Sequence, residues 1–210
     1  MSPSRAMRNR RLAMMLSRLE KIQSPSVELE QYCTDGEIAA RWLSDISAFG
    51  DLYVGCTVAD LGAGNGLLGL GAMVLGAERA ILIEADQAAC DAAKLNAEKM
   101  GFTDSVDVIQ ASIGGDSIEI GSADVVISNP PWGRQSPRAD RPFLNSILSA
   151  RLPSHLMHSA EANHIGALFE EHGWSVERYG EVDFPLPATY AHHSRQRGKT
   201  RAAFWRLTPQ

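Results

Sequence analysis

One segment restricts the possible folds of this chain more than any other. Residues Val58 to Leu61 form a short apolar strand that runs directly into the turn Gly62-Ala63-Gly64-Asn65-Gly66, and a helical pattern follows. Glycines permit positive φ and let a ligand approach the backbone closely. A second apolar strand ends at Glu84, whose carboxylate is placed to accept hydrogen bonds from ribose hydroxyls. This order is typical of a doubly wound α/β sheet, which binds nucleotide cofactors at the carboxyl ends of its strands.

The spacing of the glycines separates two classes of cofactor. A dinucleotide site has the pattern G-x-G-x-x-G, whereas this chain has G-x-G-x-G with Asp60 just before it. Asp60 would repel a pyrophosphate, but it could pair with the amino-acid ammonium group of S-adenosyl-L-methionine, which we therefore expect as the cofactor. The residues of this region expected to bind it are Asp60, Gly62, Ala63, Gly64, Asn65, Glu84 and Ala85.

The apolar strand at residues 123–128 ends in the sequence Asn129-Pro130-Pro131-Trp132. Proline cannot donate to a strand ladder and ends a central strand, and it keeps Asn129 out of helical geometry. Such a turn can hold an amide oxygen, a carbonyl oxygen and an aromatic face around a planar amino group. We expect Asn129, Pro130, Pro131 and Trp132 to be the catalytic residues of methyl transfer to an amino nitrogen, with Asn129 also at the cofactor.

The composition fits one domain without a membrane span. A chain of 210 residues suffices for a single α/β unit, and no apolar stretch approaches the ~20 residues that cross a bilayer. The N-terminus has arginines but no apolar region of a secretory signal. Cys33, Cys56 and Cys90 are widely spaced, which argues against disulfides or a zinc site and indicates a reducing cytoplasm.

The net charge of −5 is unevenly distributed. Residues 1–21 carry +5 and residues 192–210 also carry +5, which leaves −15 for the middle of the chain. Basic ends on an acidic body fit local contact with phosphates, although a solvated basic tail is the alternative for the N-terminal run. The candidate RNA-contacting residues are Arg134, Arg138, His192, His193, Arg195, Arg197 and Lys199.

Hydrophobic periodicity predicts strands that alternate with helices. Strands are expected near residues 57–61, 80–84, 106–110, 123–128, 154–158, 175–184 and 201–207. Helices are expected near residues 7–23, 66–75, 86–100, 141–150 and 161–172, with another after a cap at Asp35. The last two strands have no helix between them and therefore predict an antiparallel edge pair. We expect residues 1–50 to form N-terminal helices and a segment that covers the cofactor, and residues 51–210 to form the core.

The chain resembles the methyltransferase-like protein 5 family and its archaeal relatives. The shared motifs are Leu29-Glu30-Gln31-Tyr32-Cys33-Thr34, Asp60-Leu61-Gly62-Ala63-Gly64, Asn129-Pro130-Pro131-Trp132-Gly133, Asp140-Arg141-Pro142-Phe143-Leu144 and the segment from Leu186 to His193. The resemblance implies a class I Rossmann-like fold, with a mostly parallel seven-stranded sheet, an antiparallel edge hairpin and helices on both faces. It also implies adenine-N6 methylation of RNA, with small-subunit rRNA as the substrate and a small zinc-ribbon activator protein as partner. It adds to the cofactor-binding residues Gln31, Tyr32, Thr34, Ser112 and Ile113.

Two positions depart from the pattern of that family. Trp132 stands where the family usually has phenylalanine, which enlarges the stacking face. Ser112 stands near the position of an acidic residue that typically meets the cofactor adenine. Its hydroxyl is a weaker partner, so cofactor affinity is the property that this change affects.

Two other functions remain open. A protein glutamine-N5 methyltransferase uses the same Asn-Pro-Pro-aromatic device, but usually carries an extra N-terminal helical domain. A non-catalytic RNA-binding ribosome assembly factor would keep the fold; Asn129 argues against it, while Ser112 leaves it open. His155, His158 and His164 show no ligand spacing with cysteines or carboxylates, so we expect structural roles for them and no metal.

Overall fold

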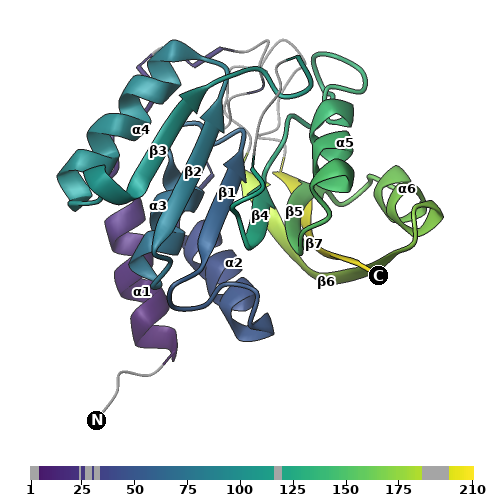
Figure 1. Cartoon of the computed structure of the whole chain (residues 1–210), viewed down its shortest axis with the longest axis horizontal. Helices are drawn as coiled ribbons and strands as arrows, with labels where there is room; N and C mark the ends of the chain where they lie inside the picture. The colour runs from purple at the N-terminus through teal and green to yellow at the C-terminus, as the bar shows by residue number, and fades with distance from the viewer. Residues whose placement is uncertain (1–4, 24, 27–29, 31–33, 116–119, 186–198) are drawn as a thin grey trace.

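The centre of the molecule is a seven-stranded sheet with the strand order β3-β2-β1-β4-β5-β7-β6, shown in Figure 1. The computed structural model describes residues 5–23, 25–26, 30, 34–115, 120–185 and 199–210. The strands are β1 (Thr57–Leu61), β2 (Arg79–Glu84), β3 (Val106–Gln110), β4 (Val125–Ser128), β5 (Ser154–Ser159), β6 (Trp174–Pro185) and β7 (Lys199–Pro209). The helices are α1 (Arg5–Leu16), α2 (Gly36–Phe49), α3 (Leu67–Val74), α4 (Gln87–Met100), the 3-10 turn η1 (Thr103–Ser105), α5 (Arg141–Ala150) and α6 (His164–Glu171).

Strands β1 to β5 run parallel, and β7 is antiparallel to both of its neighbours, β5 and β6. The predicted parallel sheet with an antiparallel pair at one edge is therefore confirmed. The connection between β1 and β2 contains α3, and parallel strands require a crossover of this kind.

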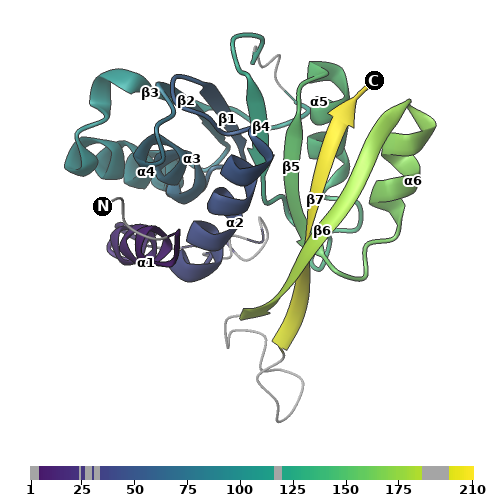
Figure 2. The same ribbon diagram turned by 90° about the horizontal axis from the view of Figure 1, so that it is seen from below.

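The side chains of the central strands alternate between two hydrophobic cores, because successive residues of a strand point to opposite faces. In β1, Val58 belongs to the core beneath α1, α2, α3 and α4, whereas Ala59 belongs to the core beneath α5 and α6. Figure 2 shows α1 beside α2, away from α5 and α6. Trp42 of α2, fully buried, stacks on Phe204 of β7 at 5.5 Å between ring centroids, which ties the N-terminal helices to the sheet.

Helix α1 ends at Leu16, so the prediction of a helix as far as residue 23 was wrong. Beyond it, the side chain of Asn96 in α4 accepts a hydrogen bond from the Glu20 N–H at 2.8 Å and donates one to the Glu20 carbonyl at 3.1 Å. These bonds replace helical ones for Glu20. The amphipathic pattern of residues 7–23 contains no sign of a partner 76 positions away.

Three other helix ends have recognisable caps, and the one at Asp35 was predicted. Asp35 caps α2 by accepting a hydrogen bond from the Glu37 N–H at 2.7 Å. Gly101 ends α4 with φ +78°, and Gly173 follows α6 with φ +75°, a conformation that favours glycine. In the part of the chain that the structure describes, no helix is long and apolar enough to cross a membrane. Cys56 and Cys90 are buried and free, whereas Cys33 lies outside the described residues.

Candidate active site

The glycine turn and the Asn-Pro-Pro-Trp turn meet because they follow neighbouring strands in register. Leu61, the last residue of β1, lies opposite Ser128, the last residue of β4. The Ser128 hydroxyl donates a hydrogen bond to the Leu61 carbonyl at 2.8 Å. Gly62 and Asn129 therefore leave the sheet side by side, where the connections from β1 and β4 turn to opposite faces. Open α/β sheets bind their ligands at this switch point.

A cavity of about 520 Å³ lies at this end of the sheet. Its volume is in the ordinary range for small-molecule sites. The predicted site residues that line it are Thr34, Gly62, Ala63, Gly64, Asn65, Glu84, Ala85, Ser112, Ile113, Asn129, Pro130, Pro131 and Trp132. Gln31 and Tyr32 lie outside the described residues.

The glycine turn is locked to β2 and leaves no room for a side chain at its first position. The N–H groups of Gly62 and Ala63 both donate to the Ile83 carbonyl, at 2.9 and 3.0 Å. Gly62 has φ +75°, and a Cβ there would lie 3.0 Å from the ring of Phe143 in α5. Glycine is therefore required at Gly62 for two reasons, its backbone conformation and the aromatic ring above it.

Glu84 lies at the end of β2 and lines the cavity, although only 7% of its surface is exposed. Its Oε2 accepts a hydrogen bond from the Gly64 N–H at 2.8 Å, and its Oε1 accepts one from the Asp86 N–H at 3.0 Å. An ionised carboxylate has about four acceptor positions. In Glu84, two acceptor positions are taken by these backbone N–H groups, which fix the carboxylate. The remaining positions suit a pair of hydroxyl groups.

Asp60 does not occupy the position predicted for it. Its side chain is completely buried and does not line the cavity. Its Oδ2 accepts a hydrogen bond from the Gly69 N–H at 2.9 Å, so the carboxylate caps the start of α3 beneath the glycine turn. Burial raises its pKa to about 7, and the nearby charge of Glu84 adds to the increase. The prediction that Asp60 pairs directly with a ligand ammonium group is corrected, because the side chain points under the turn.

The segment after α1 forms one wall of the cavity, through residues that were not among the predicted site residues. Lys21, Ile22 and Pro25 line it. The Asn65 side chain donates to the Glu20 carbonyl at 2.8 Å and so holds this wall in place. Asn65 lines the cavity as predicted, but its amide N–H is used to anchor the N-terminal segment.

The Asn129 carboxamide is held at both ends. Its Nδ2 donates to the Thr34 hydroxyl at 3.2 Å, and its Oδ1 accepts from the indole N–H of Trp132 at 3.1 Å. An indole nitrogen can only donate, so this contact identifies the oxygen of the amide. Trp132 also packs against Phe184 of β6, at 5.0 Å between ring centroids.

Glu30 is a further residue of the site, and no site role was predicted for it. It is 5% exposed and has φ +50°. Its two carboxylate oxygens accept hydrogen bonds from the backbone N–H groups of Trp132 and Gln135, both at 2.7 Å. Glu30 thus holds the turn that contains Asn129. Its only sign in the sequence is its place within the shared motif from Leu29 to Thr34.

The candidate RNA-contacting residues are only partly described. Arg134 donates to the Thr200 hydroxyl of β7 at 2.7 Å and lies 6.0 Å from the centre of the Trp132 ring, beside the cavity. Arg138 lines a separate groove along α5. Lys199 begins β7, whereas His192, His193, Arg195 and Arg197 lie outside the described residues.

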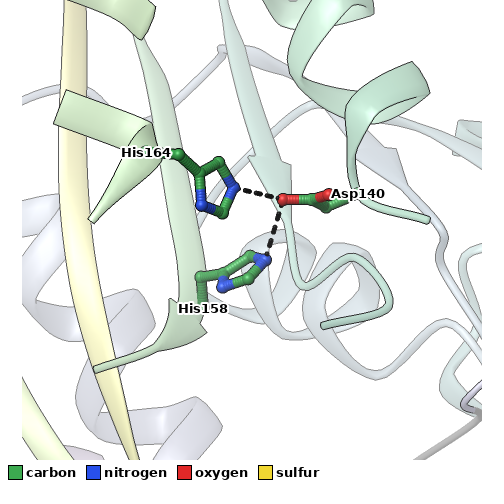
Figure 3. A group of neighbouring side chains, drawn as sticks. All are labelled: Asp140, His158 and His164. Carbon is green, nitrogen blue, oxygen red and sulfur yellow. Dashed lines mark hydrogen bonds and ion pairs between the residues drawn. The ribbon is translucent and has the colours of Figure 1, made fainter. Parts of the chain in front are cut away.

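The three histidines do not share one role. His155 is buried between Asp51 and Tyr179, with contacts of 2.9 and 3.1 Å, and a structural role for it stays a prediction. His158 and His164 both approach the carboxylate of Asp140, shown in Figure 3. Their spacing in the sequence gave no sign of this carboxylate, because the three residues come from different elements and only the fold brings them together.

Comparison with known proteins supports a methyltransferase. The family model of ribosomal protein L11 methyltransferase (PrmA) matches residues 39–130. An uncharacterized protein of Methanocaldococcus jannaschii is 34% identical over 199 residues, which cover 90% of this chain and 89% of the relative. The rRNA N6-adenosine methyltransferase METTL5 of Danio rerio is 31% identical over 211 residues, which cover 97% of this chain and 100% of the relative.

The solved structures give the same result. PH1948 of Pyrococcus horikoshii, a candidate RNA methyltransferase, matches with a TM-score of 0.85 and 31% sequence identity over 97% of this chain and 98% of that one. Sheet order, helices and motifs agree with the class I Rossmann-like fold that the sequence resemblance implied. The chain therefore belongs to the METTL5 family of methyltransferases.

Proposed function

We propose that this protein is an S-adenosyl-L-methionine-dependent methyltransferase that modifies the N6 amine of adenine in RNA, with small-subunit rRNA as the substrate. The observation that carries the proposal is the position of Asn129, which lines the same cavity as Gly62 and Glu84. The rRNA N6-adenosine activity of METTL5 relatives that match almost the whole chain supports the substrate class.

The residues of the cavity fit this cofactor. Glu84 offers acceptors for ribose hydroxyls, and Gly62 presents its backbone to the cavity without a side chain. Ala85, Ser112 and Ile113 would surround the adenine, and Thr34, Ala63 and Gly64 the rest of the molecule. When bound, S-adenosyl-L-methionine supplies a methyl group on a sulfonium that is already activated for transfer.

The chain's own task is to prepare the adenine amine. The lone pair of that nitrogen is delocalised into the ring, which makes it a poor nucleophile. The Asn129 oxygen and the Pro130 carbonyl would accept its two hydrogens and favour the pyramidal nitrogen of the transition state. Preorganised polar groups of this kind contribute a factor of ~10²–10³ each. Trp132 would stack on the base, which must be unpaired or flipped out to enter.

Methyl transfer to this amine requires no strong general base. The amine becomes acidic as the methyl group arrives, and its proton passes to an acceptor or to water. The main contribution of the protein is then alignment of two reactants, a positioning effect. Arg134, next to Trp132, is in a position to meet a phosphate that flanks the target base.

The alternative of a protein glutamine-N5 methyltransferase explains the Asn129 turn equally well, but not the relatives. The METTL5 relative from Danio rerio, an rRNA methyltransferase, is matched over its full length, whereas a relative that modifies a protein, the ribosomal protein L11 methyltransferase of Alteromonas mediterranea, is matched over 28% of its length. The alternative of an inactive assembly factor is disfavoured by the two hydrogen bonds that fix the Asn129 carboxamide.

A small activator protein remains part of the proposal. Strand β3 is an edge of the sheet, and Ile109 in it is 38% exposed. A shallow groove lined by Val106 and Val108 runs beside it. Exposed apolar edge strands are places where another chain adds to a sheet. If an activator binds there, Ile109→Glu prevents its co-purification without lowering cofactor affinity.

The substrate class is tested by offering RNA and protein to the same enzyme. Purified protein is incubated with isotope-labelled S-adenosyl-L-methionine and either small-subunit rRNA or the total ribosomal protein fraction. The proposal expects label in N6-methyladenosine after nucleoside digestion and none in methylglutamine. Label in the protein fraction alone would move the assignment to the glutamine alternative.

A further inference from the structure

Three side chains near the cavity form a cluster that the proposed mechanism does not use. Asp140 precedes α5, His158 lies in β5 and His164 begins α6. The Asp140 Oδ2 lies 2.6 Å from His164 Nε2 and 3.2 Å from His158 Nε2. Figure 3 shows the two imidazoles directed at the one carboxylate. The pKa of Asp140 is lowered to about 2, since the two histidines outweigh the effect of its burial.

Two imidazoles and a carboxylate whose ligand atoms lie within 4.8 Å of one another are also the donor set of many metal sites. An imidazole that binds a metal keeps its proton on the other nitrogen and donates it to a neighbour. In His158 that other nitrogen, Nδ1, accepts a hydrogen bond from the Ser159 N–H at 2.9 Å, so it carries no proton. The proton of a neutral His158 is therefore on Nε2, the atom nearest Asp140. This tautomer is unsuited to a metal.

The fixed tautomer gives His158 a different role. Only 2% of its surface is exposed, and Asp140 and the Ser159 N–H define the plane of its ring. The ring stacks on Trp132 with 6.0 Å between centroids and 24° between planes. The contact between His158 Nε2 and the Asp140 carboxylate does not have the geometry of a hydrogen bond. It is an electrostatic contact between the carboxylate charge and the imidazole N–H. The cluster thus supports the indole from behind.

Trp132 in turn determines the orientation of the Asn129 carboxamide. The indole N–H occupies one acceptor position of Oδ1, and the Thr34 hydroxyl holds Nδ2. A carbonyl oxygen has two lone pairs, so one remains for an incoming amine. Phenylalanine, the usual residue at this place in the resembled family, would preserve the stacking face but has no N–H.

We propose that Trp132 is a positioning residue for Asn129, and that His158, held by Asp140, keeps the indole where its N–H reaches the Asn129 oxygen. This inference rests on the proposed function, in which Asn129 accepts a hydrogen from the substrate amine. It assigns His158 and Asp140 to the support of the catalytic turn.

A double-mutant cycle tests the first half. Trp132→Phe and Thr34→Val each remove one hydrogen bond from the carboxamide. With saturating RNA and cofactor, each single variant is expected to transfer methyl about tenfold more slowly, because misplacement of a reacting group has effects of this order or larger. The double variant should lose less than the product of the two, because both bonds hold the same group. Cofactor affinity of Trp132→Phe, measured by calorimetry, should stay within about twofold of wild type. Strictly multiplicative losses, or full activity of Trp132→Phe, would overturn the inference.

His158→Phe tests the second half in two backgrounds. It keeps an aromatic ring behind position 132 but removes the contact with Asp140. We expect methyl transfer about threefold to tenfold slower in the Trp132 protein and no further loss in Trp132→Phe, where no N–H remains to be aimed. Equal losses in both backgrounds would show that His158 only packs. A stoichiometric metal in purified wild type that disappears in His158→Phe would also overturn the assignment. If His158→Phe does not fold, the first cycle still decides on Trp132.

The failure of this inference can be told apart from failure of the proposed function. If wild type makes no N6-methyladenosine, or Asn129→Ala makes as much as wild type, the function itself is wrong. If product formation depends on Asn129 but not on the Trp132 N–H, only the positioning role is wrong.

Discussion

The Ser128 hydroxyl donates a hydrogen bond to the Leu61 carbonyl at 2.8 Å, across the last register position shared by β4 and β1. The next residues in the chain are Asn129 and Gly62. This contact therefore joins the turn proposed to bind the amine to the turn proposed to bind the cofactor. The two motifs are far apart in sequence, and the parallel pairing of β1 with β4 makes one site of them.

Gly62→Ala is expected to weaken cofactor binding at least tenfold. A Cβ at Gly62 meets the Phe143 ring at 3.0 Å, in addition to the cost of a side chain at φ +75°, which is about 1–2 kcal/mol. Gly50→Ala is the matched control, because Gly50 has φ +82° with nothing within 4 Å of the added atom. Calorimetric titration with S-adenosyl-L-methionine should separate the two variants. Equal affinities would contradict the close approach at Gly62.

Asn96→Ala should loosen the wall of the cavity that follows α1. The Asn96 side chain is fully buried and bonds the backbone of Glu20 twice and that of Asn65 once. Its loss leaves these groups without their partner and should cost about 2–4 kcal/mol in the free energy of unfolding. Cofactor affinity should fall as well, since Lys21 and Ile22 line the cavity. Urea unfolding of this variant and of the exposed Asn145→Ala would measure the difference, and equal midpoints would argue against the anchor.

Asp60 should make the fold less stable as pH rises through the acid range. Burial raises its pKa in the folded state to about 7, against 3.8 for an ordinary carboxyl. Between these values the folded state holds a proton that the unfolded state has lost, so stability falls by up to about 1.4 kcal/mol per pH unit and levels off above pH 7. Asp60→Asn carries no such proton and should lack this slope. Urea unfolding from pH 4 to pH 8 measures the free energy of unfolding of wild type and of Asp60→Asn. The same dependence on pH in both proteins would contradict the raised pKa of Asp60.

The contribution of Asp51 to stability should have the opposite dependence on pH. Burial alone would raise the pKa of Asp51, but hydrogen bonds from His155 and Arg206 lower this pKa to about 2. The stability from this carboxylate, about 2 kcal/mol, is present above pH 4 and is lost as pH falls through the folded-state value. Asp51→Asn should destabilise the protein at pH 7 and unfold with a weaker dependence on acid. Because Asp51 does not line the cavity, cofactor affinity should not change; a loss of affinity would show that the contact serves the site.

Sequence reasoning found the parts of the site that local pattern encodes. The glycine turn, Glu84 at a strand end and the Asn129 turn each follow an apolar strand, so their place at one edge of a parallel sheet could be predicted. Side-chain direction could not. Asp60 looked like a ligand group in sequence but points beneath the turn to cap α3.

The remaining differences depend on contacts between distant segments. The early end of α1 follows from Asn96, and the support of Trp132 follows from His158 and Asp140. Glu30 bonds two backbone N–H groups about a hundred positions away, at separations of 102 and 105 residues. No periodicity or local motif records such pairs, so only the folded arrangement shows them.

The most direct test of the central claim compares Asn129→Ala with wild type in two assays on the same preparations. Calorimetry measures the affinity for S-adenosyl-L-methionine, and nucleoside mass spectrometry measures N6-methyladenosine formed in small-subunit rRNA. With saturating cofactor we predict a rate of methyl transfer lower by ~10²–10³ in the variant, far beyond any loss of cofactor affinity, because Asn129 supplies an acceptor to the amine. Equal rates, or a loss of rate that merely follows a loss of cofactor binding, would contradict the role assigned to Asn129.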